Sequence, residues 1–215
     1  MNTIIGIDAN HDSMTRVVSR HRTKRVYPNF VERGFRVTRF TGKKAARLPV
    51  AAAAAQPDVV YLTGVGHGAF DRFEGHDDVP VFEIGKYAVA EVHRKIVHLI
   101  SCLTANGLGP DFVRNGTLAY FGYDDNFAFD NRSRVPCLEC DSEIDRGFAD
   151  GLTAGDVYQR AHDAFTAQIQ LARENGKPMV AATLENNRDH LCAPSIHSRF
   201  GSLEARIGGT ESRNT

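Results

Sequence analysis

Two residues that can do chemistry together, His67 and Cys102, each follow an apolar segment that is typical of a buried β-strand. His67 lies in Gly-Val-Gly-His-Gly after Val59–Thr63, and Cys102 comes directly after Val97–Ser101. In open α/β sheets, ligands bind beyond the carboxyl ends of the strands, so we expect both side chains to face one ligand. An imidazole that takes the proton of a thiol makes the sulfur nucleophilic. The pair therefore predicts attack of Cys102 on a carbonyl, with His67 as general base.

Glycines flank the histidine on both sides. Gly66 and Gly68 allow the backbone to turn sharply and to approach a ligand closely. The amide N–H groups of Gly68 and Cys102 are expected to form an oxyanion hole, in which the loss of one donor typically costs about 3–4 kcal/mol of transition-state stabilisation. This chemistry requires no cofactor.

The segments that must position these loops alternate between strand-like and helix-like patterns. Thr3–Ile7 and Leu118–Tyr123 are typical of further buried strands, and Thr153–Asn175 has an apolar face at helical spacing. This alternation predicts an α/β layered fold with a mainly parallel sheet covered on both faces. The polar segment 124–150 is expected to be a long exposed loop, and Met179–Leu184 a last strand or a helical turn.

The two loops also carry a resemblance to a known family. Tyr-Leu-Thr-Gly-Val-Gly-His-Gly (61–68) and Val-His-Leu-Ile-Ser-Cys-Leu-Thr (97–104) resemble the caspase-like cysteine peptidases, most closely the gingipain, clostripain and CHAT-domain branches. In those proteins an apolar strand precedes His-Gly, and a second apolar strand ends in the nucleophilic cysteine. Asn-Arg-Asp-His-Leu (187–191) is similar to a late strand of gingipain-like members. The resemblance implies a cysteine endopeptidase with a caspase-like three-layer sandwich and a mostly parallel central sheet of about six strands.

The sequence departs from these families at two points. True caspases carry Gln-Ala-Cys and a histidine about 50 residues upstream, whereas this chain has Ile-Ser-Cys and 35 residues separate position 67 from position 102. Clostripain-like members often place an acid two residues before the cysteine, and Ile100 occupies that position here. Asp124 and Asp125, which follow the next strand, can pair with a substrate Arg or Lys, although Asp-Asp-Asn is also ordinary turn chemistry. Cleavage after basic residues therefore stays open.

Two other classes of protein compete with the peptidase. Residues 64–69 match the Gly-x-Gly-x-x-Ala form of a dinucleotide-binding loop, and Glu83 lies near the expected acidic position. That motif must open a full helix, but Gly75 and Pro80 leave room for barely one turn. A caspase-like fold can also serve as a non-catalytic interaction or scaffold module. The presence of both His67 and Cys102 favours catalysis over that alternative.

Two groups of residues have the composition of a metal site. Cys137 and Cys140 have the spacing of half a structural zinc site, which His190 and Cys192 could complete. Two thiols in a surface loop are the simpler interpretation. Some clostripain and gingipain relatives use calcium, and hard oxygen ligands follow the histidine loop, although a solvated acidic loop is the simpler interpretation there too. These ligands are Asp71, Glu74, Asp77 and Asp78.

The composition limits the partners and the compartment. Lys plus Arg and Asp plus Glu are both 26, so the formal net charge of zero gives no electrostatic argument for a nucleic-acid or membrane partner. We expect a protein or peptide substrate instead. The chain begins without a basic leader and has no apolar stretch long enough to span a bilayer, which predicts a cytoplasmic protein. Its cysteines are then expected to be thiols, metal ligands or a nucleophile. One domain is expected over residues 1–207, followed by a disordered tail over 208–215.

Overall fold

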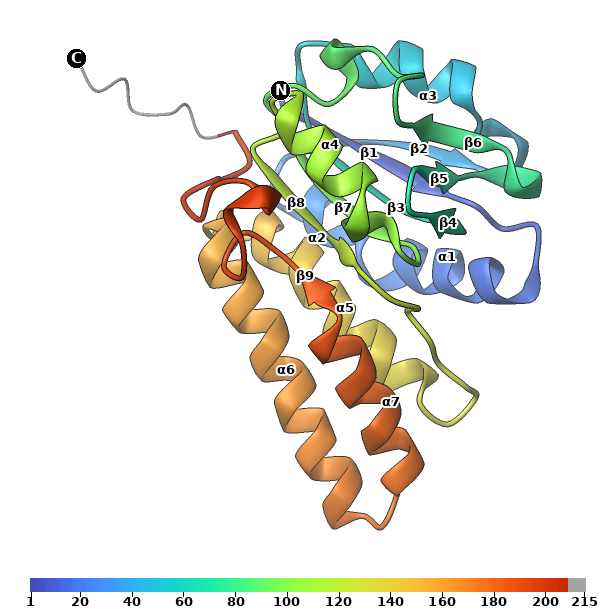
Figure 1. The fold of residues 1–215 in the computed structure, drawn as a ribbon, viewed down its shortest axis with the longest axis vertical. Helices are drawn as coiled ribbons and strands as arrows, with labels where there is room; N and C mark the ends of the chain where they lie inside the picture. Colours follow the sequence, from blue (N-terminus) through green and yellow to red (C-terminus); the bar gives the residue numbers. More distant parts are fainter. Residues whose placement is uncertain (209–215) are drawn as a thin grey trace.

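A central sheet separates two layers of helices in the computed structural model, which describes residues 1–208 (Figure 1). The strand order is β2-β1-β3-β7-β8-β9, and every pairing is parallel except that of β8 with β9. The predicted α/β sandwich with a mostly parallel sheet of about six strands is confirmed. The strands are β1 (Thr3–Asp8), β2 (Arg36–Thr41), β3 (Val59–Val65), β7 (Ile96–Ile100), β8 (Ala119–Tyr123) and β9 (Leu191–Cys192).

Both faces of the sheet are apolar, as expected for a buried parallel sheet. Successive side chains of a strand point to opposite faces, so Ile4 packs on one helical layer while Ile5 packs on the other. One face is covered by α3 (Arg47–Ala54) and α4 (Leu108–Arg114). The other layer contains α1 (Ser13–Arg25), α2 (Tyr27–Glu32), α5 (Arg134–Ala149) and the first turns of α6 (Ala154–Glu174).

The helices α5, α6 and α7 (Pro178–Asp189) pack on one another and extend beyond the sheet (Figure 1). Two predictions about this region are wrong. The segment 124–150 is an exposed loop only up to residue 133, because residues 134–149 form α5. Met179–Leu184 lies inside α7 and is neither a strand nor a single turn. Two acids on the inward face of α5, Asp141 and Asp145, are fully buried and hide the apolar pattern of the helix in the sequence.

A small antiparallel sheet follows β3 and supports the histidine loop. It consists of β4 (Gly68–Ala69), β5 (Arg72–Glu74) and β6 (Pro80–Glu83). The amide N–H of Glu74 donates to the carbonyl oxygen of His67 at 2.9 Å, which ties the loop to β5. Residues 68–74 therefore form a hairpin at the place where a dinucleotide-binding loop opens a helix.

A network of buried charges joins the sheet to the helices. The guanidinium of Arg22 on α1 lies 3.0 Å from Asp8 on β1 and 3.1 Å from Asp145 on α5. His98 on β7 lies 3.3 Å from both Asp141 and Asp145. Burial on its own lowers the pKa of His98, but these two carboxylates raise it to about 9. His98 is therefore charged at neutral pH and compensates the buried acids.

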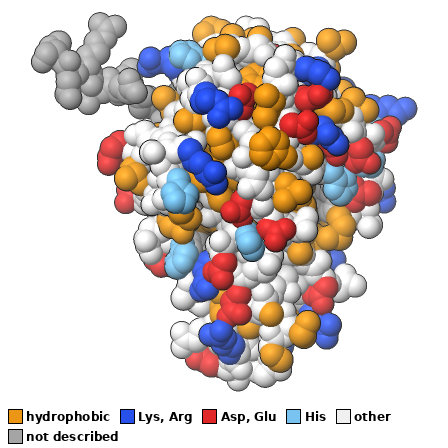
Figure 2. Space-filling model, viewed as in Figure 1, with side chains coloured by type: hydrophobic (Ala, Val, Ile, Leu, Met, Phe, Trp, Pro, Cys, Tyr) orange, Lys and Arg blue, Asp and Glu red, His pale blue; other side chains and the backbone are white. Residues whose placement is uncertain are grey.

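Acidic and basic side chains are interspersed on the face of the molecule shown in Figure 2. Within residues 1–208, no helix combines the length and the apolar character that crossing a lipid bilayer requires. The predicted tail, apart from Gly208, lies outside the described residues.

Candidate active site

The two loops predicted to carry the chemistry begin at the same edge of the sheet. Strands β3 and β7 are neighbours, Val65 pairs with Ile100, and the N–H of Gly66 donates to the carbonyl oxygen of Ile100 at 3.3 Å. Because the strands are parallel, His67 and Cys102 both lie just beyond their carboxyl ends. A Cβ atom added to Gly68 would lie 3.0 Å from the carbonyl oxygen of Cys102, so the loops are in backbone contact.

Gly66 and Gly68 allow the loops to pack this closely. A side chain at Gly66 would collide with the carbonyl oxygen of Glu74, and one at Gly68 would collide with the hydroxyl of Ser101. The sequence predicted that these glycines permit close approach to a ligand. The structure gives another reason for these glycines, because the contacts within the chain leave no room for a side chain at either position.

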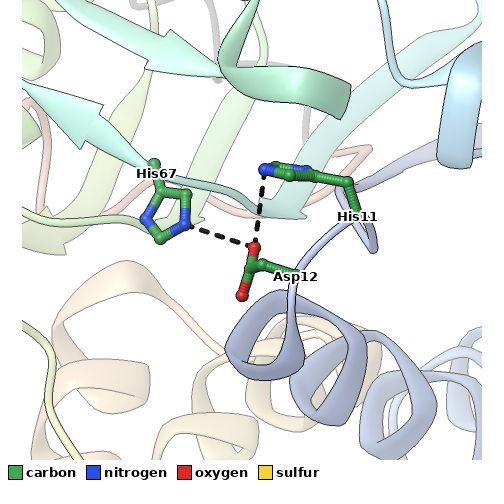
Figure 3. Close-up of side chains that lie close together, drawn as sticks. All are labelled: His11, Asp12 and His67. Carbon is green, nitrogen blue, oxygen red and sulfur yellow. Dashed lines mark hydrogen bonds and ion pairs between the residues drawn. The ribbon is translucent and has the colours of Figure 1, made fainter.

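Asp12 lies beside His67 in the candidate site, although the sequence did not single it out. It is the N-cap of α1, and its Oδ1 accepts hydrogen bonds from the N–H groups of Met14 at 2.7 Å and Thr15 at 3.1 Å. Its Oδ2 lies 3.2 Å from Nε2 of His67 (Figure 3). A signal was present in the sequence, because Asp12 and Ser13 follow a buried strand and precede a helix, which is typical of an N-cap.

The Asp12 carboxylate is held in its charged form. Burial alone raises the pKa of Asp12, but hydrogen bonds from Thr15 and Met14, together with the nearby His67, lower it to about 2. A carboxylate in this position fixes the orientation of an imidazole and stabilises the imidazolium that forms when the ring takes a proton. The other ring nitrogen of His67 points away from Asp12 (Figure 3).

The thiol of Cys102 is half-buried. Burial raises its pKa, the charge of Asp125 raises it further, and a hydrogen bond from the backbone N–H of Phe127 partly offsets both effects. A base is therefore needed to produce the thiolate. Among residues 1–208, the hydrogen bond of the His67 side chain is to Asp12 and not to Cys102. Catalytic hydrogen bonds often form only when the substrate is bound.

Asp124 and Asp125, considered for binding a basic side chain, lie beside the cysteine loop. The N–H of Leu103 donates to the carbonyl oxygen of Asp125 at 3.3 Å, and the amide of Asn106 donates to that of Asp124 at 2.6 Å. Both carboxylates face His190, whose Nδ1 lies 2.8 Å from Asp124 and whose Nε2 lies 3.7 Å from Asp125. A basic substrate side chain would have to compete with His190 for these acids.

The residues of the predicted zinc site lie in different parts of the molecule. All four cysteines are free thiols. The simpler interpretation, two thiols in a surface loop, is also wrong, because Cys137 and Cys140 belong to α5 and are buried between α5, α6 and α7. Cys192 packs in the core on the α4 face of the sheet. Burial raises the pKa of Cys137 to about 12 and that of Cys192 to about 12, which stabilises thiols rather than metal-binding thiolates. His190 faces the Asp124–Asp125 loop instead.

The acidic residues considered for calcium also divide into separate interactions. Asp71 and Glu74 both form ion pairs with Arg72. Asp77 lies near His76, and Asp78 lies 3.1 Å from Nε2 of His11. In the described part of the chain, the groups of possible metal ligands whose atoms lie within 4.8 Å of one another combine histidines with aspartates. They are His11 with Asp12 and His67, and His98 with Asp141 and Asp145.

Comparison with known proteins adds no family to this geometry. No protein-family model matches the chain, and no curated protein matches it either. The resemblance to caspase-like peptidases therefore stays a prediction. Support for a function therefore comes from the geometry of the site, in which the loops that carry Asp12, His67, Cys102 and Asp125 lie at one edge of the sheet.

Proposed function

We propose that this chain is a cysteine endopeptidase in which Cys102 is the nucleophile, His67 the general base and Asp12 the residue that orients His67. The observation that carries the proposal is the ion pair of His67 with Asp12, at 3.2 Å, on the loop that contacts the Cys102 backbone. Nucleophilic catalysis by cysteine needs an oriented imidazole, and this one lies on a loop whose backbone contacts that of Cys102.

The reaction proceeds through a thioester. The substrate carbonyl binds between the sulfur of Cys102 and the amide N–H groups of Gly68 and Cys102. His67 takes the thiol proton, the sulfur attacks the carbonyl carbon, and the amides stabilise the oxyanion. His67 then gives the proton to the leaving amine, and a water molecule hydrolyses the thioester with His67 again as base. Asp12 stabilises the imidazolium in both halves of the reaction.

The acids beside the site favour a substrate with Arg or Lys before the cleaved bond. Asp125 contacts the cysteine loop through its carbonyl oxygen, and its side chain is 46% exposed. A guanidinium can bind such a carboxylate in a bidentate manner. Displacement of His190 by the substrate would release both Asp124 and Asp125 for this contact.

The direct test uses a peptide library and a substrate-like electrophile that alkylates thiols. The Cys102→Ala variant is expected to lose all cleavage and all labelling, because it lacks the nucleophile. The matched control is Cys192→Ala, which removes a buried thiol from the core and should keep both signals. Equal labelling of Cys102→Ala and the parent protein would rule out the assignment.

A non-catalytic interaction module is the second candidate. The absence of a His67–Cys102 hydrogen bond within residues 1–208 and the raised pKa of Cys102 favour it. A library screen in which the folded parent protein cleaves no peptide, while Cys102 stays unlabelled, would select this function over the peptidase.

A further inference from the structure

His11, Asp12 and His67 form a compact cluster at the site, and the proposed reaction uses only the last two. Oδ2 of Asp12 lies between the two rings, 3.2 Å from Nε2 of His67 and 3.6 Å from Nε2 of His11 (Figure 3). The three ligand atoms lie within 4.8 Å of one another. The residues come from the loop after β1 and the loop after β3, so the sheet brings them together.

A further carboxylate and a further histidine surround His11. Oδ1 of Asp78 lies 3.1 Å from the same Nε2 atom, and the ring of His76 packs edge-on against His11 with centroids 5.5 Å apart. The Nδ1 atoms of His11 and His76 are buried and lack a hydrogen-bond partner among the described residues. These Nδ1 atoms are not ligand atoms of the cluster, which uses Nε2 of His11 and Nε2 of His67 around Oδ2 of Asp12.

The spacing of the ligand atoms fits a small transition-metal ion. Imidazole nitrogen and carboxylate oxygen lie about 2.0–2.2 Å from zinc, so neighbouring ligands of a tetrahedral ion lie about 3.3–3.5 Å apart. The measured separations of 3.2 Å and 3.6 Å bracket that range. Two histidines and one carboxylate leave a fourth position for water. A donor set rich in imidazole favours zinc over calcium or magnesium.

We propose that His11, Asp12 and His67 bind a zinc-type divalent ion, and that this ion inhibits the peptidase. The inhibitory role rests on the proposed function, whereas the binding does not. Coordination through Nε2 of His67 leaves the ring proton on Nδ1, which then cannot accept the proton of Cys102. The ion also takes Asp12 away from its role in stabilising the imidazolium. Metal binding and catalysis therefore exclude each other.

Zinc affinity is measured first, on the full chain, by competition with a chromogenic chelator. The parent protein should bind one zinc ion per chain at this site. His11→Asn should weaken that binding by at least about tenfold because a ligand is lost. The control His162→Asn changes a histidine on α6, outside the cluster, and should bind as the parent does. Circular dichroism of the metal-free proteins checks that each variant is folded.

Cys102→Ala separates this site from a metal that bridges the catalytic pair. We expect its zinc affinity to equal that of the parent. Loss of binding in Cys102→Ala, unchanged binding in His11→Asn, preference for calcium, or no zinc binding by the folded parent would each overturn the proposed site.

Inhibition is measured next. The activity of each variant in the presence of zinc is compared with the activity of the same variant in the presence of a chelator. The zinc concentration that halves peptide cleavage should rise at least about tenfold in His11→Asn. Cleavage by a parent protein that binds no zinc would overturn this inference and leave the peptidase standing. Zinc binding through His11 in a protein that cleaves no peptide would overturn the peptidase and the inhibition, and leave the metal site.

Discussion

At the scale of single residues, the carboxylate of Asp12 has two roles that a substitution can separate. It caps α1 and it orients His67. Asn is as good an N-cap as Asp, but it carries no charge. Asp12→Asn should therefore stay folded with a capped α1, at a somewhat lower thermal midpoint because the folded protein stabilises the charged carboxylate. It should lower kcat/KM by about 10²–10⁴-fold, because the imidazolium loses its counter-charge.

Peptide cleavage and thermal denaturation of the same preparation check this prediction. The control is Asp130→Asn, because Asp130 also accepts hydrogen bonds in a turn before a helix but lies in a different loop. A fall in kcat/KM of the same size in both variants would contradict the role of Asp12.

The charge of Asp125 acts on the nucleophile. Burial is the main cause of the raised pKa of Cys102, and Asp125 adds to it. Asp125→Asn should lower the pKa of the thiol, because an anion disfavours a second anion nearby. The rate of alkylation of Cys102 against pH measures this, and its midpoint should move to lower pH. Asp71→Asn, in the hairpin after β4, is the control with the same loss of charge.

The sequence predicted the two reacting residues but not the residue that orients one of them. His67 and Cys102 could be found because each follows its own apolar strand directly. Asp12 also follows a strand, β1, but its relation to His67 depends on β1 lying next to β3. Strand order is set by long-range pairing, and a local pattern does not contain it.

At the scale of secondary-structure elements, α5 shows why one stretch was predicted as a loop. Asp141, Ser142 and Asp145 are buried on its inward face, where polar residues are normally absent. Partners of the two acids lie far away in the sequence, as in the hydrogen bond from Arg22 to Asp145 at 3.1 Å across 123 positions. The strands and α6 were predictable because apolar residues dominate their buried faces, even where a strand carries one buried charge such as His98.

The contact of α5 with β7 should make stability depend on pH. The pKa of His98 is about 9 in the folded protein, against 6.5 for the ordinary side chain, because Asp141 and Asp145 outweigh its burial. The charged ring thus stabilises the folded state fully below pH 6.5, and this contribution disappears as the pH rises through 9. Linkage gives it a size of about 3 kcal/mol.

Urea denaturation at several pH values between 6 and 10 measures this effect. The free energy of unfolding should fall with rising pH in the parent more steeply than in His98→Gln, which cannot titrate. Ionisation of buried thiols affects both proteins equally, so the difference between them isolates His98. Parallel curves for the two proteins would show that His98 is not charged in the folded state.

At the scale of the whole molecule, the buried charges connect the two halves of the chain. Arg22 on α1 donates to Asp8 on β1 and to Asp145 on α5, and 123 positions separate Arg22 from Asp145. All three side chains are fully buried, where the sheet meets the layer that contains α1 and α5. The candidate active site and the network of buried charges use the same strands, because Asp12 follows β1 and Cys102 follows β7.

Removing Arg22 should therefore destabilise the entire fold rather than α1 alone. Arg22→Leu leaves the buried carboxylates of Asp8 and Asp145 without their main positive partner, and breaking a buried pair costs about 3–5 kcal/mol. That is a large part of the roughly 5–15 kcal/mol by which a domain is stable. Urea denaturation should show one cooperative transition at a much lower midpoint. Arg20→Leu, which removes an exposed arginine from the same helix, should stay close to the parent. A local loss of helix signal with an unchanged main transition would instead mean that α1 is dispensable for the sheet, and that the position of Asp12 beside His67 does not depend on this network.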